Sequence, residues 1–322
     1  MITAIDSFAG AGGSSTGLTQ AGIEVVWAAN HWPLAIGTHQ DNHPDVEHHT
    51  ANLSDIDWRT VPRTDIGWFS PSCRGHAPAG GRKRPPAEVE RLRADAAAID
   101  RATAFAVIAA AEVLEFPVIF VENVVEFAAW SLYPWWLAGL HMLGYRTREL
   151  VLDAAAFGHA QQRKRLFIAA TRGGVELDLT PPVVAPVSAS AILDDDLGRP
   201  VTRRLYVADQ IDSITVEGVP HLVTYRRHAR ARRADEHPLA TVTAGGNHHA
   251  VAQVRDYIQY HRMLTNRECA RAQGFPDGYT FRGCKEDVKK QIGNAVPVGI
   301  ARWLGERAVE ALAGQSLMEV AA

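Results

Sequence analysis

Short apolar runs alternate with stretches of helical periodicity up to about residue 170. The runs that predict buried strands are 2–5, 24–29, 65–69, 118–121 and 166–170. Between two of them, the apolar residues of 104–114 recur at helical spacing. Because strands that alternate with helices form a mostly parallel sheet covered on both faces, the sequence predicts an α/β fold.

A change of composition near Val175 predicts a second, smaller domain. From there to about Tyr260 the chain contains prolines, an acidic cluster at 194–196 and short strand-like pieces. We expect an irregular, β-rich domain over 175–262, and a first domain formed by 1–174 and 263–322. The end of the chain is helical again, with apolar residues on one face, and is expected to pack on the first domain.

Bulk properties are those of an ordinary soluble globular protein. The chain has 322 residues, of which 47% are hydrophobic and 21% charged, and a net charge of −3. The first residues, Met1–Asp6, lack the pattern of a signal peptide, and we find no apolar run long enough to span a bilayer. Three cysteines at unrelated spacings argue against a disulfide framework, so we expect a cytoplasmic protein.

A glycine-rich turn follows the first predicted strand. Gly10, Gly12 and Gly13 allow the main chain to bend tightly and to approach a ligand closely. Ser14 or Ser15 is expected to cap the helix that follows. Since a strand, a glycine-rich turn and a helix also suit a dinucleotide-dependent oxidoreductase, the turn alone leaves that function open.

Two side chains with catalytic chemistry follow predicted strands. Cys73 comes shortly after 65–69, and Glu122 comes directly after 118–121. Open α/β sheets place their chemistry at the carboxyl ends of strands, so we expect a nucleophilic thiol to face an acid there. His76 lies three residues after Cys73, but a metal site needs further ligands, and none is expected.

Cationic side chains lie in three places. Arg163 and Arg165 alternate, so they share a face if the chain is extended there, and their planar donors suit base oxygens or phosphates. The runs 80–84 and 226–233 are strongly basic, which favours phosphate contact over a merely solvated face. The loop 70–95 is long enough to predict a functional lid.

Taken in order, these motifs resemble the C5-cytosine DNA methyltransferases over 1–172 and 263–315. The matching segments are Asp6-x-Phe8-x-Gly10-x-Gly12-Gly13, Cys73, Glu122-Asn123-Val124, Gln161-x-Arg163-x-Arg165, 267–271 and Gln291-x-Gly293-Asn294-Ala295. The resemblance implies a Rossmann-like catalytic domain of S-adenosylmethionine (SAM)-dependent methyltransferases. Thr241-Val242-Thr243 is similar to the short motif of target-recognition domains, which implies that role for 175–262.

The resemblance also implies SAM as the cofactor, with Phe8 stacked on its adenine. In the family an acid usually follows the second strand and another holds the adenine amino group; here those positions are His31 and Asn52. The cofactor-binding residues implied are Asp6, Phe8, Gly10, Gly12, Gly13, His31, Trp32, Asn52, Leu53 and Asn294.

The catalytic residues implied are Cys73, Glu122, Arg163 and Arg165. In that family the thiolate attacks C6 of cytosine, the acid donates to N3, and the arginines contact the base, which has left the duplex. Ser72 and Ala77 stand where the family usually has Pro and Ser.

The resemblance further implies double-stranded DNA as the partner. We expect the protein to act as a monomer in a prokaryotic or phage-infected cell. The DNA-binding residues expected are Arg82, Lys83, Arg84, Gln161, Arg226, Arg227, Arg230, Arg232 and Thr241. Two related functions stay open at this point. One is a tRNA cytosine-5 methyltransferase on the same scaffold, and the other is a DNA-binding relative with impaired catalysis.

Overall fold

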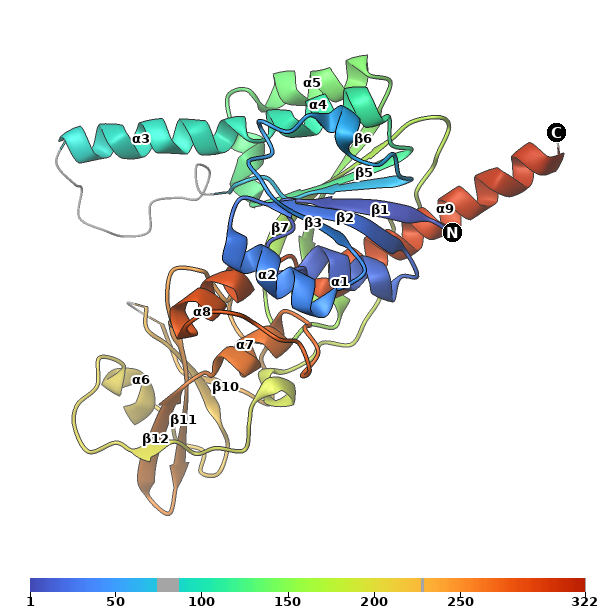
Figure 1. Cartoon of the computed structure of the whole chain (residues 1–322). Coiled ribbons are helices and arrows are strands. Elements are labelled where there is room, and N and C mark those ends of the chain that lie inside the picture. Colours follow the sequence, from blue (N-terminus) through green and yellow to red (C-terminus); the bar gives the residue numbers. More distant parts are fainter. Residues whose placement is uncertain (74–86, 227–228, 322) are drawn as a thin grey trace. The chain divides into compact units, whose positions relative to one another are not determined.

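The computed structural model describes residues 1–73, 87–226 and 229–321 (Figure 1). By its contacts the chain divides into two compact units. The first unit contains Met1–Leu152, Lys164–Thr180 and Ile300–Ala322, and the second contains Asp153–Arg163 and Pro181–Gly299. The predicted sites at Arg82, Lys83, Arg84 and Arg227 lie outside the described residues.

A seven-stranded sheet forms the centre of the first unit, in the order β3-β2-β1-β4-β5-β7-β6. The strands from β3 to β5 pair in parallel, and β7 pairs antiparallel to β5, which confirms the predicted α/β class. Their bounds are β1 Thr3–Ser7, β2 Glu24–Asn30, β3 Glu47–Thr50, β4 Ile66–Phe69, β5 Val118–Asn123, β6 Arg146–Asp153 and β7 Lys164–Thr171.

Helices cover both faces of this sheet (Figure 1). One face carries α4 (Phe105–Leu114) and α5 (Tyr133–Met142), and the other carries α1 (Gly13–Gln20), α2 (Pro33–Asn42) and α9 (Val298–Ala321). The remaining helical elements of the first unit are α3 (Ala87–Ala102), η1 (Trp58–Thr60) and η2 (Val125–Ala129). Within the described ranges, the helices are all too short or too polar to cross a membrane.

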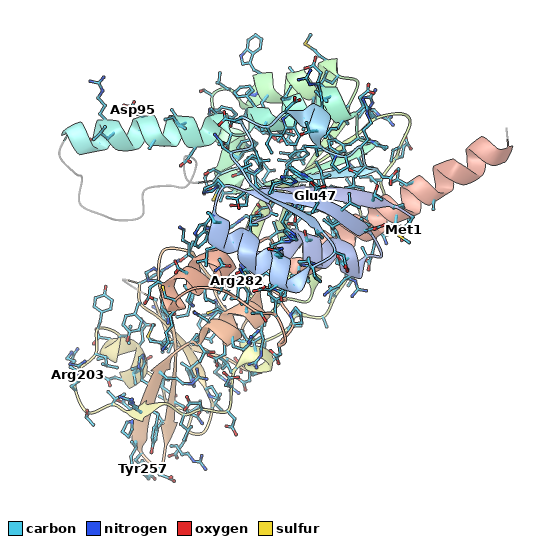
Figure 2. All side chains as sticks on the ribbon, viewed as in Figure 1. Met1, Glu47, Asp95, Arg203, Tyr257 and Arg282 are labelled. Atoms are coloured by element: carbon cyan, nitrogen blue, oxygen red, sulfur yellow. The ribbon has the colours of Figure 1, made fainter. Side chains whose placement is uncertain are left out.

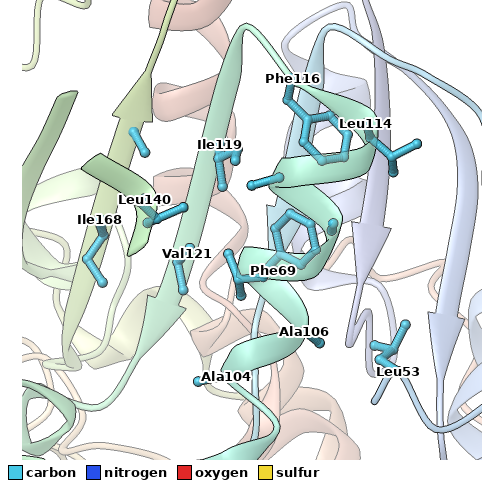
Figure 3. Close-up of a cluster of buried hydrophobic side chains, with 14 of the residues drawn as sticks. Leu53, Phe69, Ala104, Ala106, Leu114, Phe116, Ile119, Val121, Leu140 and Ile168 are labelled. Carbon is cyan, nitrogen blue, oxygen red and sulfur yellow. The ribbon is translucent and has the colours of Figure 1, made fainter. Parts of the chain in front are cut away.

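The apolar core on the α4 side fixes β4 against β5 (Figure 3). Phe69, Phe116 and Ile119 are all fully buried there. A side chain at Gly67 would place its first carbon 2.7 Å from the Phe69 ring and 3.0 Å from the Phe116 ring, so the packing requires glycine at this position. These contacts hold the two strands that carry Cys73 and Glu122.

An antiparallel sheet of five strands, in the order β10-β9-β11-β12-β8, forms the smaller unit's β-rich part. Its strands are β8 Arg199–Pro200, β9 His221–Thr224, β10 Arg232–Arg233, β11 His249–Arg255 and β12 Ile258–Met263. Its helical elements are η3 Ala154–Phe157, η4 Ala189–Ile192, α6 Ala208–Asp212, α7 Asn266–Ala272 and α8 Lys285–Asn294. Tyr257 lies at the tip of the β11–β12 hairpin (Figure 2).

The second unit is larger than the domain expected over 175–262, because 263–299 and 153–163 also belong to it. Buried hydrogen bonds explain the difference. The Gln161 amide donates to the carbonyl of Ala272 (3.1 Å), and its oxygen accepts from the main-chain N–H of Val242 (2.6 Å). These bonds join the 153–163 segment to α7 and to the region after β10.

Several histidines are buried in the neutral form. Burial, together with a neighbouring histidine, lowers the pKa of His43 to about 4 and holds that of His39 well below 6.5. In the second unit burial lowers the pKa of His159 and of His249 to about 4. The Nε2 atom of His159 accepts a hydrogen bond from the Gly299 N–H (2.9 Å), which requires the neutral ring.

We therefore predict that acid destabilises the fold. An unfolded histidine has a pKa of about 6.5, so the unfolded chain binds more protons than the native chain between about pH 6.5 and 4. The contribution of these histidines to the free energy of unfolding is fully present above this window and is lost as pH decreases through it, by roughly 3 kcal/mol for His159, whose pKa is about 4. Burial raises the pKa of Asp6 to about 6, so this carboxyl group stabilises the fold as pH decreases below about 6. Its contribution opposes that of the histidines and is smaller than their sum.

Urea unfolding followed by tryptophan fluorescence at several pH values tests this prediction. The His159→Gln variant should be less stable at neutral pH but should lose less stability on acidification. A free energy of unfolding that stays constant or rises as pH decreases through this window would contradict it.

Candidate active site

The glycine-rich turn connects β1 to α1 through left-handed backbone. Phe8 has φ 62°, Gly10 φ 56° and Gly12 φ 90°. The left-handed region is costly for a bulky residue such as Phe8, and such strain is concentrated at binding sites. The strained turn therefore marks the carboxyl end of β1 as a candidate ligand site.

Asp6, on β1, is hydrogen-bonded to the first residues of the helix that follows this turn. Its fully buried carboxylate accepts hydrogen bonds through Oδ2 from the hydroxyls of Ser14 (2.5 Å) and Ser15 (2.6 Å). The expected capping role of Ser14 or Ser15 is not observed, because Gly12 is the N-cap residue of α1 and the serine hydroxyls are directed to Asp6. We call these two hydrogen bonds the Asp6 clamp, and they fix the start of α1 relative to β1.

A chain of hydrogen bonds continues from this clamp. The Ser15 hydroxyl lies 2.8 Å from Nε2 of His39, whose Nδ1 lies 2.7 Å from Nε2 of His48. These histidines come from α2 and β3, so three elements of the first unit meet at the base of the turn. Our sequence reasoning missed this network, although the clustering of histidines at 39–49 was a visible signal.

The ends of β2 and β3 present the other expected cofactor residues. His31 and Asn52 are exposed, Trp32 is half-buried, and the Trp32 N–H donates to Oδ1 of Asn30 (2.9 Å). The Asn52 amide donates to Asp55 (2.7 Å). Leu53 is buried in the core of this unit. Because β1, β2 and β3 are parallel neighbours, these residues share one sheet edge with the glycine-rich turn.

The segments that carry Cys73 and Glu122 leave the sheet at the same edge. The strands β4 and β5 are parallel, with Phe69 opposite Val121, so the segment after β4 lies beside the end of β5. The Asn123 amide donates to the carbonyl of Pro71 (3.1 Å) and ties this segment to β5. Cys73 is half-buried and Glu122 is buried. Both residues therefore come from adjacent strand ends, and the pairing of the thiol with the acid stays a prediction.

Arg165 orients the acid. Its Nε lies 3.3 Å from Oε1 of Glu122, and both side chains are mostly buried. Arg165 is on β7, which pairs antiparallel to β5 with Phe167 opposite Glu122. A buried cation beside the carboxylate restricts its rotation, so Arg165 is well placed to act with Glu122 on one substrate.

Arg163 has a different environment from Arg165, although the two residues alternate. Its side chain is 1% exposed in the second unit, where Nη1 donates to the carbonyl of Val242 (2.9 Å) and Nη2 to those of Gly293 (2.9 Å) and Ala295 (3.0 Å). This geometry differs from the expected contact with a base, because main-chain carbonyls occupy both terminal nitrogens. Arg163 positions the main chain beside Asn294.

Gln161 also differs from expectation. We expected it to bind DNA, but it is fully buried, and its amide bonds to Ala272, Gln273 and Val242. The Thr241 hydroxyl donates to the carbonyl of Gln162 (2.8 Å). A side chain at Gly293 would place a carbon 2.2 Å from the Ala244 nitrogen, so this motif brings two main chains into direct contact.

Several side chains suited to nucleic acid are exposed on the second unit. Arg226, Arg230 and Arg232 are exposed, as is Asn294 at the end of α8. Tyr206, which our sequence reasoning missed, is 72% exposed and stacks on Tyr225 with an interplanar angle of 14°. Cations and an exposed aromatic ring are the groups that contact phosphates and bases.

Comparison with known proteins agrees with this geometry. The profile of C-5 cytosine-specific DNA methylases matches residues 2–190 and 202–310. The chain belongs to the C-5 cytosine-specific DNA methylase family. The resemblance seen in the motifs is thereby confirmed, and this methylase is an enzyme of the DNA (cytosine-5)-methyltransferase class.

Two relatives of this methylase match more than nine tenths of the chain. It is 31% identical over 314 residues to the Type II methyltransferase M.HgiDI of Herpetosiphon aurantiacus, covering 93% of this chain and 92% of that protein. It is 27% identical to M.MthTI of Methanothermobacter thermautotrophicus, covering 95% and 97%. The structure of the methyltransferase EhMeth of Entamoeba histolytica has the same fold, with a TM-score of 0.70, 13% identity, and coverage of 97% and 99%.

The different environments of the two arginines predict different defects. Arg163→Ala leaves buried carbonyls without donors, so we expect it to lower the free energy of unfolding by roughly 3 kcal/mol or more. Arg165→Ala should change stability much less but should reduce methyl transfer strongly, by roughly 100-fold, because Glu122 is no longer oriented. Urea unfolding and methyl-transfer rates of both variants provide the measurement. An Arg163→Ala protein as stable as wild type would contradict the assignment.

Proposed function

We propose that this methylase transfers a methyl group from SAM to C5 of cytosine in double-stranded DNA, through a covalent bond between Cys73 and C6. The observation that carries the proposal is the arrangement at one edge of the sheet. There the strained turn after β1, the thiol after β4 and the ion-paired acid at the end of β5 lie on neighbouring strands.

The residues at the end of β1 fit a cationic cofactor. Oδ1 of Asp6 is buried without a hydrogen-bond partner, as is the hydroxyl of Ser7. A carboxylate at the end of β1 suits the positive charge of the SAM sulfonium, and Gly10, which is half-buried and has no side chain, leaves main chain accessible. Phe8, His31, Trp32 and Asn52 would hold the cofactor. When bound, SAM supplies an electrophilic methyl group.

The chain's own residues perform the rest of the reaction on the base. The Cys73 thiolate attacks C6, while Glu122 donates a proton to N3 and draws electrons from the ring. C5 thereby becomes nucleophilic enough to accept a methyl group. A water molecule or hydroxide from solvent then takes the C5 proton, the bond between Sγ and C6 breaks, and the N3 proton returns to Glu122, which frees Cys73 and restores the aromatic ring. Arg165 holds Glu122 during both steps.

The second unit supplies the DNA contacts in this proposal. Arg226, Arg230 and Arg232 present exposed charge for phosphates, and the Thr241 hydroxyl donates to the carbonyl of Gln162, the residue before Arg163. Extrusion of the target base costs a few kcal/mol, which phosphate contacts offset. We propose that the enzyme acts as a monomer in the cytoplasm of a prokaryotic or phage-infected cell, where cysteines stay reduced.

Calorimetry tests the cofactor assignment. We expect binding of SAM and of its product S-adenosylhomocysteine, and no binding of NAD. His31→Glu should tighten SAM binding by roughly 1 kcal/mol, because a carboxylate accepts charge-assisted hydrogen bonds from ribose hydroxyls. Weaker binding by this variant would show that His31 is itself a fitted contact, and tight binding of NAD without SAM would refute the proposal.

An adduct experiment tests the covalent step. Duplex DNA with 5-fluorocytosine at the target should form a gel-stable adduct with the wild-type protein and SAM, because fluorine blocks the final elimination. Cys73→Ser should form none, whereas Cys269→Ser, a buried cysteine remote in sequence, should retain it. Glu122→Gln should slow adduct formation by roughly 100-fold or more. An adduct with fluorinated tRNA and none with DNA would reassign the substrate.

A further inference from the structure

A buried lysine and a buried cysteine contact each other in the second unit. Lys289 of α8 is 5% exposed, and Cys269 of α7 is 0% exposed. Nζ of Lys289 donates to Sγ of Cys269 at 2.8 Å. The two helices pack directly against each other, and both residues lie far from Cys73 in sequence.

This environment is unusual for a lysine. A buried ammonium group normally pairs with a carboxylate, because its three donors need strong acceptors. The neighbouring acid, Glu268, is already engaged by the Arg262 guanidinium (2.7 Å) and by the Thr265 N–H (2.7 Å). His249 is no acidic partner for Lys289 either. Burial, together with the nearby charge of Lys289, lowers the pKa of His249 to about 4, so the His249 ring is neutral.

The thiol of Cys269 is therefore the group that the Lys289 amine contacts directly. We propose that Lys289 and Cys269 form a reversible oxidative cross-link in which one oxygen atom joins Nζ to Sγ. The observed separation leaves room for one bridging oxygen with ordinary bond lengths, whereas a direct bond from nitrogen to sulfur would require the helices to approach. The cross-link is a modification site separate from the methyl-transfer chemistry.

The oxidant of the proposed step is a peroxide. One neutral amine, one thiol and two molecules of hydrogen peroxide give the linkage N–O–S and three molecules of water. Nitrogen and sulfur together lose four electrons, and each peroxide accepts two. The thiol proton and one amine proton leave in the water, and an added thiol reductant reverses the reaction.

The position of Lys289 and Cys269 predicts that the cross-link changes the stability of the second unit. It would join residues 20 apart in sequence and close the loop between α7 and α8. That loop contains Phe275 and Tyr279, which pack in the same apolar cluster as Cys269 and Ile292. Closing a loop restricts the unfolded chain, so oxidation should stabilise this unit.

Mass spectrometry of a protein with one cysteine tests the proposal. In a Cys73→Ser/Cys284→Ser background, peroxide treatment and tryptic digestion should join the peptides 268–271 and 286–290 through one added oxygen with loss of two hydrogens. Thiol reductant should separate them. Lys289→Arg, which retains the charge, should abolish the product, and Lys290→Arg, changed at the next residue, should retain it.

Thermal unfolding provides the second measurement. Oxidation should raise the Tm of the background protein by about 5 °C, and should not raise that of the Lys289→Arg protein. Oxidation of Cys269 to an acid with Lys289 unmodified would overturn the proposal. A direct bond from nitrogen to sulfur, or an unmodified Cys269 after prolonged treatment, would also overturn it.

Discussion

The parallel pairing of β4 with β5 is the constraint on which the candidate active site depends. Phe69 lies opposite Val121, so both chains leave the sheet at the same level and deliver Cys73 and Glu122 to one edge. The rings of Phe69 and Phe116 leave no space for a side chain at Gly67, and this packing prevents the strands from shifting. A displacement of one residue would turn Glu122 to the opposite face of the sheet.

Residues close to these strands act by holding others rather than by reacting. Asn123 fixes the segment before Cys73, Arg165 fixes Glu122, and Asp6 fixes the start of α1. Each uses a charged or amide side chain that is largely withdrawn from solvent, where such bonds are stronger and errors of geometry are costly. A site built this way is rigid before substrate arrives, which is the condition for orientation to contribute to rate.

The sequence predicted β1, β2, β4, β5 and β7, because each contains a short apolar run, but not β3 (Glu47–Thr50) or β6 (Arg146–Asp153), which have no such run. For the same reason it placed Cys73 and Glu122 near strand ends, and their catalytic roles stay predictions. It failed where the answer depends on long-range packing. The spacing of Arg163 and Arg165 indicated a shared role, yet Arg163 bonds carbonyls that lie up to 132 residues away. Ser14 and Ser15 had the local pattern of helix caps, whose side-chain oxygens accept from the free N–H groups of the first turn, but their hydroxyls instead donate to the buried carboxylate of Asp6.

The same reasoning explains why 263–299 belong to the second unit. Composition marks Val175 as a boundary, but it cannot show that Gln161 and Arg163 bond to Ala272, Val242 and Gly293. Because these two side chains directly precede β7, the segment that connects the units also organises the second one. The residues of the motif Gln161-x-Arg163-x-Arg165 thus have two roles. Gln161 and Arg163 hold the second unit together, and Arg165 orients Glu122 in the first unit.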